Sequence, residues 1–230
     1  MSIHRNGVLM GVKLISYTKP TDAMKEKGIQ TLQDIVAYCA RVSNPSNQMN
    51  SETSQKLIKY LIKHKHWSPL EMVSMCLELD TTRDIAHQIV RHRSFSFQEF
   101  SQRYANPDEM GEMFTFRECR LQDKENRQNS IETNDNKLKE EWLEKQEQVI
   151  RMSKEVYDWA IFNGIAKEQA RVVLPEGLTK TRLYMNGTLR SWVHYINLRI
   201  DNGTQKEHRI LAQQSLREVS RVFSLIGDII

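Results

Sequence analysis

The segment from Arg91 to Tyr104, RHRSFSFQEFSQRY, concentrates side chains that could do chemistry. Its arginines stay charged at any relevant pH, and their fork-shaped N–H groups suit a phosphate or a carboxylate. His92 titrates near neutrality and could carry a proton or stack on a flat ring. Glu99 is the lone carboxylate of the segment and could orient a guanidinium or accept hydrogen bonds from a sugar or a base. This mixture predicts a site for an anionic ligand, and the alternative is a solvated basic end of a helix.

More arginines recur through the second half of the chain, each beside apolar residues that favour a cleft or a partly buried place: Arg171, Arg182, Arg190 and Arg199. Arg190 and Arg199 are about two and a half turns apart if one helix carries both. They therefore cannot both contact one small group, and we infer either two ligand moieties or two subunits that share one site. The alternative for these arginines is surface ion pairing with Glu168, Asp201 and Glu207.

Other kinds of catalytic site lack their usual motifs. His64 and His66 have a spacing that suits a strand better than the helix end expected here, so we expect no metal site. The ring of His66 could instead stack on a flat group, or it is an ordinary surface histidine. The serines near His92 have no G-x-S-x-G elbow, and no cysteine lies in an electropositive motif. Glycine-rich phosphate loops are absent too, so any nucleotide must be held by side chains.

The composition indicates the environment of the protein. Its 230 residues contain 33 Lys and Arg against 29 Asp and Glu, so the net charge is only +4. This balance suits a small anionic ligand better than long nucleic acid. The 3 cysteines are widely spaced, which favours a reducing compartment over a disulfide framework. Neither an export signal nor an apolar run of about 18 residues is found, so we expect a soluble cytoplasmic protein without a membrane partner.

Apolar periodicity predicts a mixture of helices and strands. Helices are expected at 31–41, 52–65, 138–162, 167–173 and 189–199, with one more from 83 and a last one that runs through 222. Strands are expected at 8–17 and 73–80. Thr82 is predicted to cap the helix that begins at Arg83, and Thr204 with Glu207 forms a capping-box pattern for the last helix. The Arg91–Tyr104 segment then starts at the end of a helix and continues as a loop.

A long stretch, 112–163, contains no glycine and no proline. Its first part is strongly polar, and we interpret 108–136 as a mobile surface insertion. The helix that follows is predicted to bury an apolar stripe made of Trp142, Val149, Ile150, Val156, Tyr157 and Ile161. No internal repeat and no linker are present, so we expect one catalytic domain over 1–230, of the α+β class.

The RHRSFSFQEFSQRY segment resembles the signature RHRxxSxNExSxRY of the flavin-dependent thymidylate synthases. Further blocks similar to this family extend over most of the chain: ARVS at 40–43, HKHWSPLE at 64–71, EQARVVLP at 168–175 and LRSWVHYINLR at 189–199. Gln98 stands where the family signature has asparagine, which keeps the amide on a longer side chain. The resemblance assigns nothing to residues 108–136.

The resemblance implies a mixed α+β domain of the flavin-dependent thymidylate synthase type, assembled as a homotetramer with FAD sites where subunits meet. It implies the reductive methylation of dUMP to dTMP, for de novo dTMP synthesis, without a protein nucleophile. Methylenetetrahydrofolate would supply the carbon, reduced FAD the hydride, and NADPH would reduce the flavin. The protein itself would then position and polarise the reactants.

The resemblance also assigns roles to residues at the matching positions. Arg199 is the implied catalytic residue, because a guanidinium stabilises anionic charge that develops on a pyrimidine ring. The implied dUMP-binding residues are Gln88, Arg91, Glu99, Phe100, Ser101, Gln102, Arg103, Arg171 and Arg199. The implied FAD-binding residues are Ser43, His66, Ser68, Arg91, His92, Arg93, Glu99, Arg190 and His194. No metal is implied.

Functions of other classes are also compatible with these residues. A non-catalytic nucleotide- or nucleic-acid-binding protein could use the arginines together with stacking rings, namely Phe95, Phe97, Phe100 and Tyr104. A flavoprotein oxidoreductase of another kind would bind the flavin but not respond to dUMP. Ser101 lies between Glu99 and Arg103, so a serine nucleophile is a further alternative to hydride chemistry.

Overall fold

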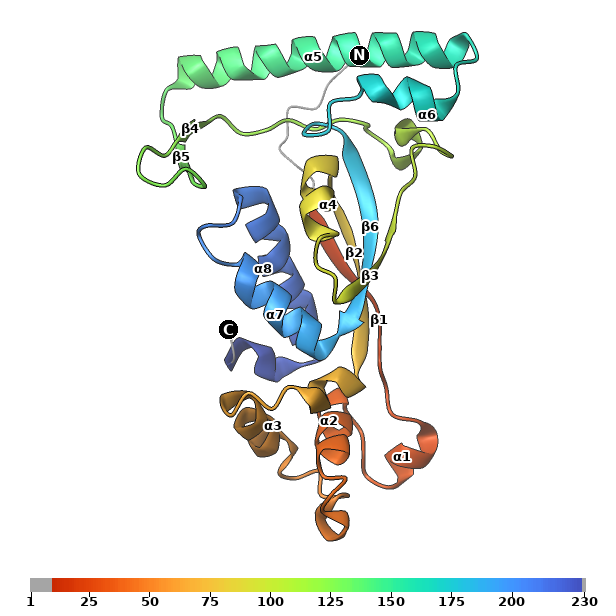
Figure 1. Ribbon diagram of the computed structural model, residues 1–230, viewed down its shortest axis with the longest axis vertical. Coiled ribbons are helices and arrows are strands. Elements are labelled where there is room, and N and C mark those ends of the chain that lie inside the picture. The colour runs from red at the N-terminus through yellow and green to blue at the C-terminus, as the bar shows by residue number, and fades with distance from the viewer. Residues whose placement is uncertain (1–9, 229–230) are drawn as a thin grey trace.

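The computed structural model describes residues 10–228, and a four-stranded antiparallel sheet lies at its centre (Figure 1). The strands are β1 (Gly11–Tyr17), β2 (Ser74–Thr82), β3 (Phe95–Glu99) and β6 (Lys180–Thr188), in the order β1-β2-β6-β3. The two central strands pair along their whole length, from Ser74 opposite Thr188 to Thr82 opposite Lys180. The predicted mixture of helices and strands is confirmed.

Alternation of side chains gives the sheet one apolar and one polar face. The apolar face is buried and contains Met75, Leu77, Leu79, Leu183 and Met185. The intervening residues face the other way, where Arg182 of β6 pairs with Asp80 of β2 at 2.7 Å. Because successive side chains of a strand point to opposite faces, one set makes the core and the other set lies toward solvent.

Three helices pack on the apolar face: α4 (Arg83–Ile89), α7 (Leu189–Arg199) and α8 (Lys206–Ser220). Trp192 of α7 is fully buried, and its Nε1 donates a hydrogen bond to the carbonyl oxygen of Met75 at 3.1 Å. The indole therefore fills the core without leaving its polar atom unpaired. A 3₁₀ helix, η5 (Ser224–Asp228), follows α8 and adds Leu225 and Ile226 to the same core.

The remaining elements lie at the two ends of the sheet (Figure 1). One end carries α1 (Asp22–Glu26), α2 (Leu32–Ala40), η1 (Pro45–Asn47), α3 (Ser54–Lys63) and η2 (Ser68–Met72). The other end carries η3 (Pro107–Met110), β4 (Arg120–Gln122), β5 (Ser130–Glu132), α5 (Asn136–Phe162), α6 (Lys167–Ala170) and η4 (Arg171–Val173). In the part of the chain that the structure describes, no helix combines the length and the apolar character needed to cross a membrane.

The predicted helices are present with small shifts of their ends. Thr82 occupies the N-cap position of α4, as predicted, but without the capping hydrogen bond, and the predicted cap of α8 is wrong. Thr82 precedes α4, yet its hydroxyl donates a hydrogen bond to Asp84 at 2.6 Å instead of accepting one from the helix backbone. Thr204 does not cap α8, because the helix begins one residue later, after Gln205, and the carboxylate of Glu207 forms an ion pair with Arg120. At Thr82 the stronger charge-assisted contact to Asp84 prevails, whereas the hydroxyl of Thr204 is directed to the carbonyl of Leu198 at 3.5 Å.

Two strands correct the sequence-based expectation. The loop predicted after α4 is wrong for Phe95–Glu99, which form β3 and pair with β6. β6 itself has no counterpart among the predicted elements. In β3 the polar Ser96 and Gln98 occupy the solvent side, so too few apolar residues remain to mark a strand. The strand predicted at 8–17 is β1, and Val8 and Leu9 lie outside the described residues.

Residues 108–136 are only in part the surface insertion that the sequence predicts. The backbone N–H of Thr115 donates to the carbonyl of Leu178 at 2.9 Å, beside the start of β6. Arg117 and Arg120 are largely buried and pair with Glu207 of α8 at 3.4 and 2.6 Å. The hairpin of β4 and β5 is exposed. Buried charges therefore anchor the segment as far as Arg120, the first residue of β4, and Lys206 pairs with Glu132 of β5 at 2.5 Å. The mobility of the exposed part of the hairpin stays a prediction.

The predicted buried stripe of the long helix α5 is right for Ile150 and Tyr157 and wrong for three other residues. The exposed ones are Trp142 at 42%, Val149 at 47% and Val156 at 37%. The helix face that the rest of the chain covers includes the polar Gln146 and Ser153. A row of apolar side chains is therefore left exposed, and we call it the α5 stripe: Trp142, Val149, Met152, Val156 and Trp159.

Gly187 of β6 lies beneath the ring of Phe95, its partner residue in β3. A Cβ at this position would overlap ring atoms of Phe95, which packs edge-on against Trp192 with centroids 4.9 Å apart. We expect Gly187→Ala to lower the free energy of unfolding by about 1–3 kcal/mol, the usual cost of overpacking a core. Urea unfolding of the purified protein measures this loss.

Gly11→Ala is the matched control for that measurement. Gly11 also lies in a strand, but a Cβ there would come no closer than 3.9 Å to Asp80. Its free energy of unfolding should stay near that of the unchanged chain. Equal losses in the two variants would contradict a close-packing requirement at Gly187.

Candidate active site

β3 divides the residues of the Arg91–Tyr104 segment into two groups. Arg91, His92 and Arg93 follow the end of α4 and precede the strand, whereas Phe100 to Arg103 follow it. Five residues of extended strand span about 17 Å. The two groups therefore lie at opposite ends of β3 and do not converge on one small moiety within the chain.

Arg199, at the end of α7, is held by a neutral histidine. Its Nε donates a hydrogen bond to Nε2 of His92 at 2.9 Å. Burial, together with the charge of Arg199, lowers the pKa of His92 to about 4, so the ring is neutral at neutral pH and can accept. His92 is thus an acceptor for Arg199 and not the proton carrier considered from sequence. The terminal nitrogens of Arg199 make no hydrogen bond to any described residue, so they are available to a ligand.

Gln88 of α4 contacts two residues at the start of α8, namely Gln205, which precedes the helix, and His208. Its Nε2 donates to Oε1 of Gln205 at 2.8 Å, and its Oε1 lies 3.3 Å from Nδ1 of His208. His208 is fully buried, and its ring centroid lies 6.3 Å from that of His92. The sequence analysis missed Gln205 and His208. The one signal for them is that His208 shares a helix face with the apolar Leu211.

Glu99, at the end of β3, is engaged within the chain. Arg83 Nη1 donates to its carboxylate at 3.1 Å, and the hydroxyl of Thr181 donates at 2.9 Å. The guanidinium that Glu99 orients within the chain is therefore that of Arg83. Gln102 is buried, and its Nε2 has no hydrogen-bond partner among the described residues. An unpaired buried donor costs free energy, so this atom is a natural contact for a ligand or a second chain.

The turn after β3 is connected to α6 and η4. Arg103 Nη2 lies 3.4 Å from a carboxylate oxygen of Glu168, which is on α6. Arg171 begins η4 directly after α6 and is half-buried. The N–H of Phe100 donates to the carbonyl of Arg182 at 2.9 Å and fixes the start of the turn beside β6. The structure thus brings the predicted phosphate donors of the turn to the same end of the sheet as Arg171.

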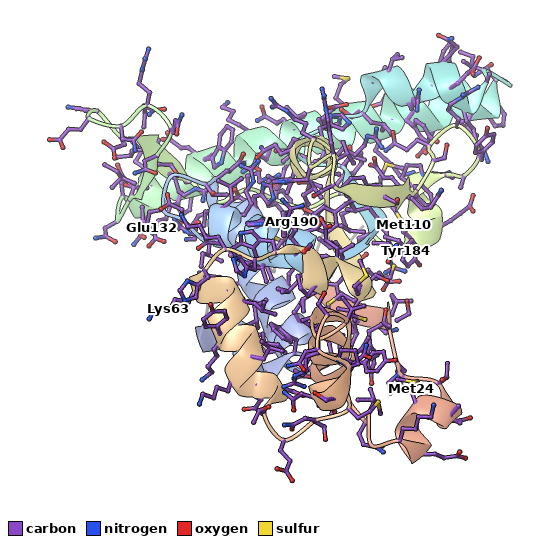
Figure 2. All side chains as sticks on the ribbon, turned by 60° about the horizontal axis from the view of Figure 1, so that its bottom comes forward. Met24, Lys63, Met110, Glu132, Tyr184 and Arg190 are labelled. Atoms are coloured by element: carbon purple, nitrogen blue, oxygen red, sulfur yellow. The ribbon has the colours of Figure 1, made fainter. Side chains whose placement is uncertain are left out.

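Two of the predicted FAD-binding residues lie where α7 meets η2. Arg190 Nη1 pairs with Glu71 at 2.5 Å, and the ring of His194 packs edge-on against Trp67 with centroids 4.6 Å apart. Burial, and then the charge of Arg190, lowers the pKa of His194 below its ordinary value. Figure 2 shows Arg190 near the middle of the molecule.

Of the other predicted FAD-binding residues, His92 and Glu99 are partly buried and engaged within the chain, and the remaining ones are exposed. His66 and Ser68 lie just before and at the start of η2, and Ser43 lies beyond the end of α2. Arg91 and Arg93 are exposed guanidinium groups without an ion-pair partner among the described residues. These donors therefore face outward and do not line one enclosed cleft.

The ion pairs considered from sequence for the later arginines are largely wrong. Arg182 pairs with Asp80 and Arg190 with Glu71, whereas Glu168 and Glu207 pair with other arginines. The partners differ because strand pairing and helix packing, not closeness in sequence, bring the charges together.

Within residues 10–228, no group of three or more His, Cys, Asp or Glu side chains is arranged to hold a metal ion. The three cysteines are free thiols and partly buried. Burial raises the pKa of Cys39 and of Cys76, which disfavours the thiolate that a nucleophile needs.

A cavity of about 830 Å³ lies between α5 and the segment 108–116. Apolar residues on its walls include Phe114, Phe116 and Ile150, and carboxylates such as Glu144 and Asp158 surround them. None of the predicted site residues lines this cavity.

Comparisons with known proteins agree on one family. The sequence pattern of the family described as thymidylate synthase complementing protein matches residues 27–224. A probable flavin-dependent thymidylate synthase of Paramecium bursaria Chlorella virus 1 is 50% identical over 203 residues, which are 88% of this chain and 90% of that protein. A flavin-dependent thymidylate synthase of Synechocystis sp. is 47% identical over 203 residues, with 88% and 91% covered.

A solved structure shares the fold. The crystal structure of the UMP/dUMP methylase PolB from Streptomyces cacaoi, bound with 5-Br dUMP, superposes with a TM-score of 0.77. The match covers 96% of this chain and 93% of that one at 22% sequence identity. At this identity the likeness concerns the fold alone.

We expect the stability to fall as the pH is lowered from 6.5 toward 5, in part because of His92. The pKa of His92 in the folded chain is about 4, below the ordinary value of 6.5. The unfolded chain therefore binds this proton first. The contribution is fully present above pH 6.5 and falls by up to about 1.4 kcal/mol per pH unit below it, until the pH reaches the folded pKa.

Urea unfolding at about pH 7, 6 and 5 measures this dependence for the unchanged chain and for His92→Asn. The variant lacks the titrating ring, so its free energy of unfolding should fall less steeply with acid. The same slope in both proteins would show that His92 is not held neutral.

Proposed function

The chain belongs to the flavin-dependent thymidylate synthase family, and from this premise we propose that it catalyses the reductive methylation of dUMP to dTMP, for de novo dTMP synthesis. The resemblance predicted from the RHRSFSFQEFSQRY segment is confirmed at the level of the family. The observation that carries the proposed reaction is the guanidinium of Arg199, oriented by neutral His92 and close to the Gln88 cluster. Free cysteines agree with a reducing compartment, and we place the enzyme in the cytoplasm.

Arg199 is proposed to stabilise negative charge that develops on the pyrimidine ring of dUMP. The hydrogen bond from its Nε to His92 fixes the guanidinium plane before a ligand arrives, so little reorganisation is needed during the reaction. Because His92 is neutral, its Nε2 keeps the lone pair that accepts from Arg199 and does not repel the guanidinium. The terminal N–H groups of Arg199 are the donors that would contact the ring.

The turn after β3 is proposed to bind the phosphate of dUMP. Ser101 and Arg103 are natural phosphate donors, and Arg171 lies on the neighbouring η4. The ion pair of Arg103 with Glu168 is long, at 3.4 Å, and both side chains are about half exposed. Such a pair contributes little to stability, so a phosphate can replace the carboxylate. The unpaired buried Nε2 of Gln102 supports a ligand contact in the same turn.

The outward-facing donors fit FAD in their chemistry. Arg91 and Arg93 are exposed and unpaired within the described chain, as suits a pyrophosphate, and His66 offers an exposed ring for stacking. When bound, FAD would supply hydride, with NADPH as its reductant and methylenetetrahydrofolate as the carbon donor. The protein would contribute by binding, orienting and polarising.

The enzyme is proposed to be a homotetramer with active sites between subunits. The dUMP-binding residues lie at opposite ends of β3, about 17 Å apart, so one chain does not complete a site by itself. The α5 stripe supports an assembly because its apolar residues are spaced by three and four along an exposed helix face: Val149, Met152, Val156 and Trp159. A second copy of the chain would bury this stripe.

Arg199→Ala is expected to keep bound flavin and to lose dTMP formation by about 100-fold or more, because a charge-stabilising donor is removed. The flavin absorbance of the purified protein is recorded first. dTMP formed from dUMP with NADPH and methylenetetrahydrofolate is then assayed. Arg217→Ala is the control, because Arg217 is exposed on α8 and has no partner among the described residues.

Flavin absorbance, with dTMP made only when all components are present, supports the proposed function. A colourless protein that neither takes up added FAD nor forms dTMP overturns it and favours the nucleic-acid-binding alternative. Unchanged turnover in Arg199→Ala would remove Arg199 from its proposed role while leaving the function in place.

Met152→Glu is expected to convert the tetramer into smaller species, because it adds a charge to the α5 stripe at a residue that is 63% exposed in the single chain. Light scattering coupled to gel filtration measures the mass. Arg151→Gln is the matched control, since it also changes the charge by −1 at an exposed position of α5, off the stripe. Dissociation by both variants, or by neither, would contradict an interface on this stripe.

A further inference from the structure

We propose that Gln205, the N-cap residue of α8, and His208 of α8 are positioning residues for dUMP, because they fix the orientation of the Gln88 amide. The inference rests on the proposed function, in which Gln88 binds dUMP. It goes beyond that function because neither α8 residue has an assigned role.

The carboxylate of Glu207 fixes the orientation of the first amide in this series, that of Gln205. Burial opposes ionisation of this side chain, but the hydrogen bond from Arg120 and the charge of Arg117 outweigh it, and the pKa lies below its ordinary value. The distances are 2.6 Å to Arg120 and 3.4 Å to Arg117. An ionised carboxylate can only accept hydrogen bonds. Gln205 Nε2 donates to it at 3.1 Å, so the amide nitrogen of Gln205 faces Glu207 and its carbonyl faces away.

Gln205 in turn fixes the orientation of the Gln88 amide. The carbonyl Oε1 of Gln205 accepts from Gln88 Nε2 at 2.8 Å. The carbonyl Oε1 of Gln88 is then directed to Nδ1 of His208, 3.3 Å away. Because a carbonyl oxygen only accepts, Nδ1 of His208 must carry a proton. The side-chain amides of Gln205 and Gln88 therefore each have one orientation that satisfies both of their hydrogen-bond partners.

His208 is suited to donate the last hydrogen bond of this series. The ring is fully buried, and burial, followed by the charge of Arg199, lowers its pKa to about 3. It is therefore neutral, with the proton on Nδ1 and a lone pair on Nε2, which has no hydrogen-bond partner among the described residues. Reversing the Gln88 amide would set N–H against N–H at His208 and carbonyl against carbonyl at Gln205. Such buried mismatches are costly, so the amide is fixed.

Gln88 is half-buried and keeps hydrogen-bonding capacity beyond these two contacts. One N–H and one carbonyl lone pair remain for a ligand. With the amide fixed, these two groups are presented in a single arrangement. A side chain free to rotate would present the donor and the acceptor in either order and would bind one nucleotide less selectively.

Two substitutions at one position test the inference. In His208→Asn the side-chain amide nitrogen takes the place of Nδ1 and can still donate to Gln88. In His208→Gln the amide nitrogen takes the place of Nε2 and leaves Gln88 without its donor. We expect the Kd of the flavin-loaded protein for dUMP, measured by titration calorimetry, to rise about tenfold in His208→Gln and to stay within about threefold in His208→Asn.

Flavin content and the urea midpoint are measured for both variants, so that a general loss of structure is distinguished from loss of the donor. A similar Kd for the two variants, whether raised or unchanged, would overturn the positioning role. A rise confined to His208→Gln at equal stability would support it.

A second measurement does not depend on the proposed function. Nitrogen-15 NMR of the unchanged protein with labelled histidine should show a buried neutral ring protonated on Nδ1, a signal lost when His208 is replaced. A ring protonated on Nε2 would overturn the inference even if the enzyme forms dTMP. If the unchanged protein forms no dTMP but this signal is present, the proposed function fails and the fixed amide remains.

Discussion

The pairing of β2 with β6 is the constraint on which the rest of the structure depends. The strands are antiparallel and in register over their whole length, so α4 begins at one end of the pair and α7 at the other. At about 1.5 Å per helical residue and 3.4 Å per strand residue, α4 and α7 placed end to end are about as long as the paired strands β2 and β6. Their ends can therefore meet, and Arg199 reaches His92 at 2.9 Å. The same pairing puts Gly187 where the ring of Phe95 needs space.

A buried carboxylate organises the polar side of the site. Glu207 binds Arg117 and Arg120, which lie on a segment that is polar in sequence and distant along the chain. Arg117 also pairs with Asp84 of α4 at 2.6 Å, so three separate parts of the chain meet at these charges. Removing one partner of a buried pair leaves an uncompensated charge and is strongly destabilising. The segment from Arg117 to Arg120, the first residue of β4, is thus as much part of the framework as the core helices are.

The two histidines beside the candidate site, His92 and His208, both form hydrogen bonds that suit a neutral ring. Burial and the nearby arginine keep both neutral, so one accepts from Arg199 and the other carries its proton toward Gln88. A permanently charged guanidinium and neutral neighbours make a strongly asymmetric environment, which suits the anionic ring of the proposed reaction. This arrangement agrees with chemistry in which a bound cofactor supplies the electrons and the protein supplies orientation.

The sequence by itself determined the family, the helices with clear apolar periodicity and the concentration of chemistry in RHRSFSFQEFSQRY. It did so because these signals are local: residue types, their spacing and the order of the blocks. It did not predict β6, the strand character of Phe95–Glu99 or the exposed α5 stripe, since strands with polar solvent sides and helix faces that the rest of the chain leaves uncovered are decided by what packs against them. Only the tertiary structure brought α8 to Gln88 and Arg199 to His92, because contacts between residues about a hundred positions apart are fixed by the pairing of strands and not by any local pattern.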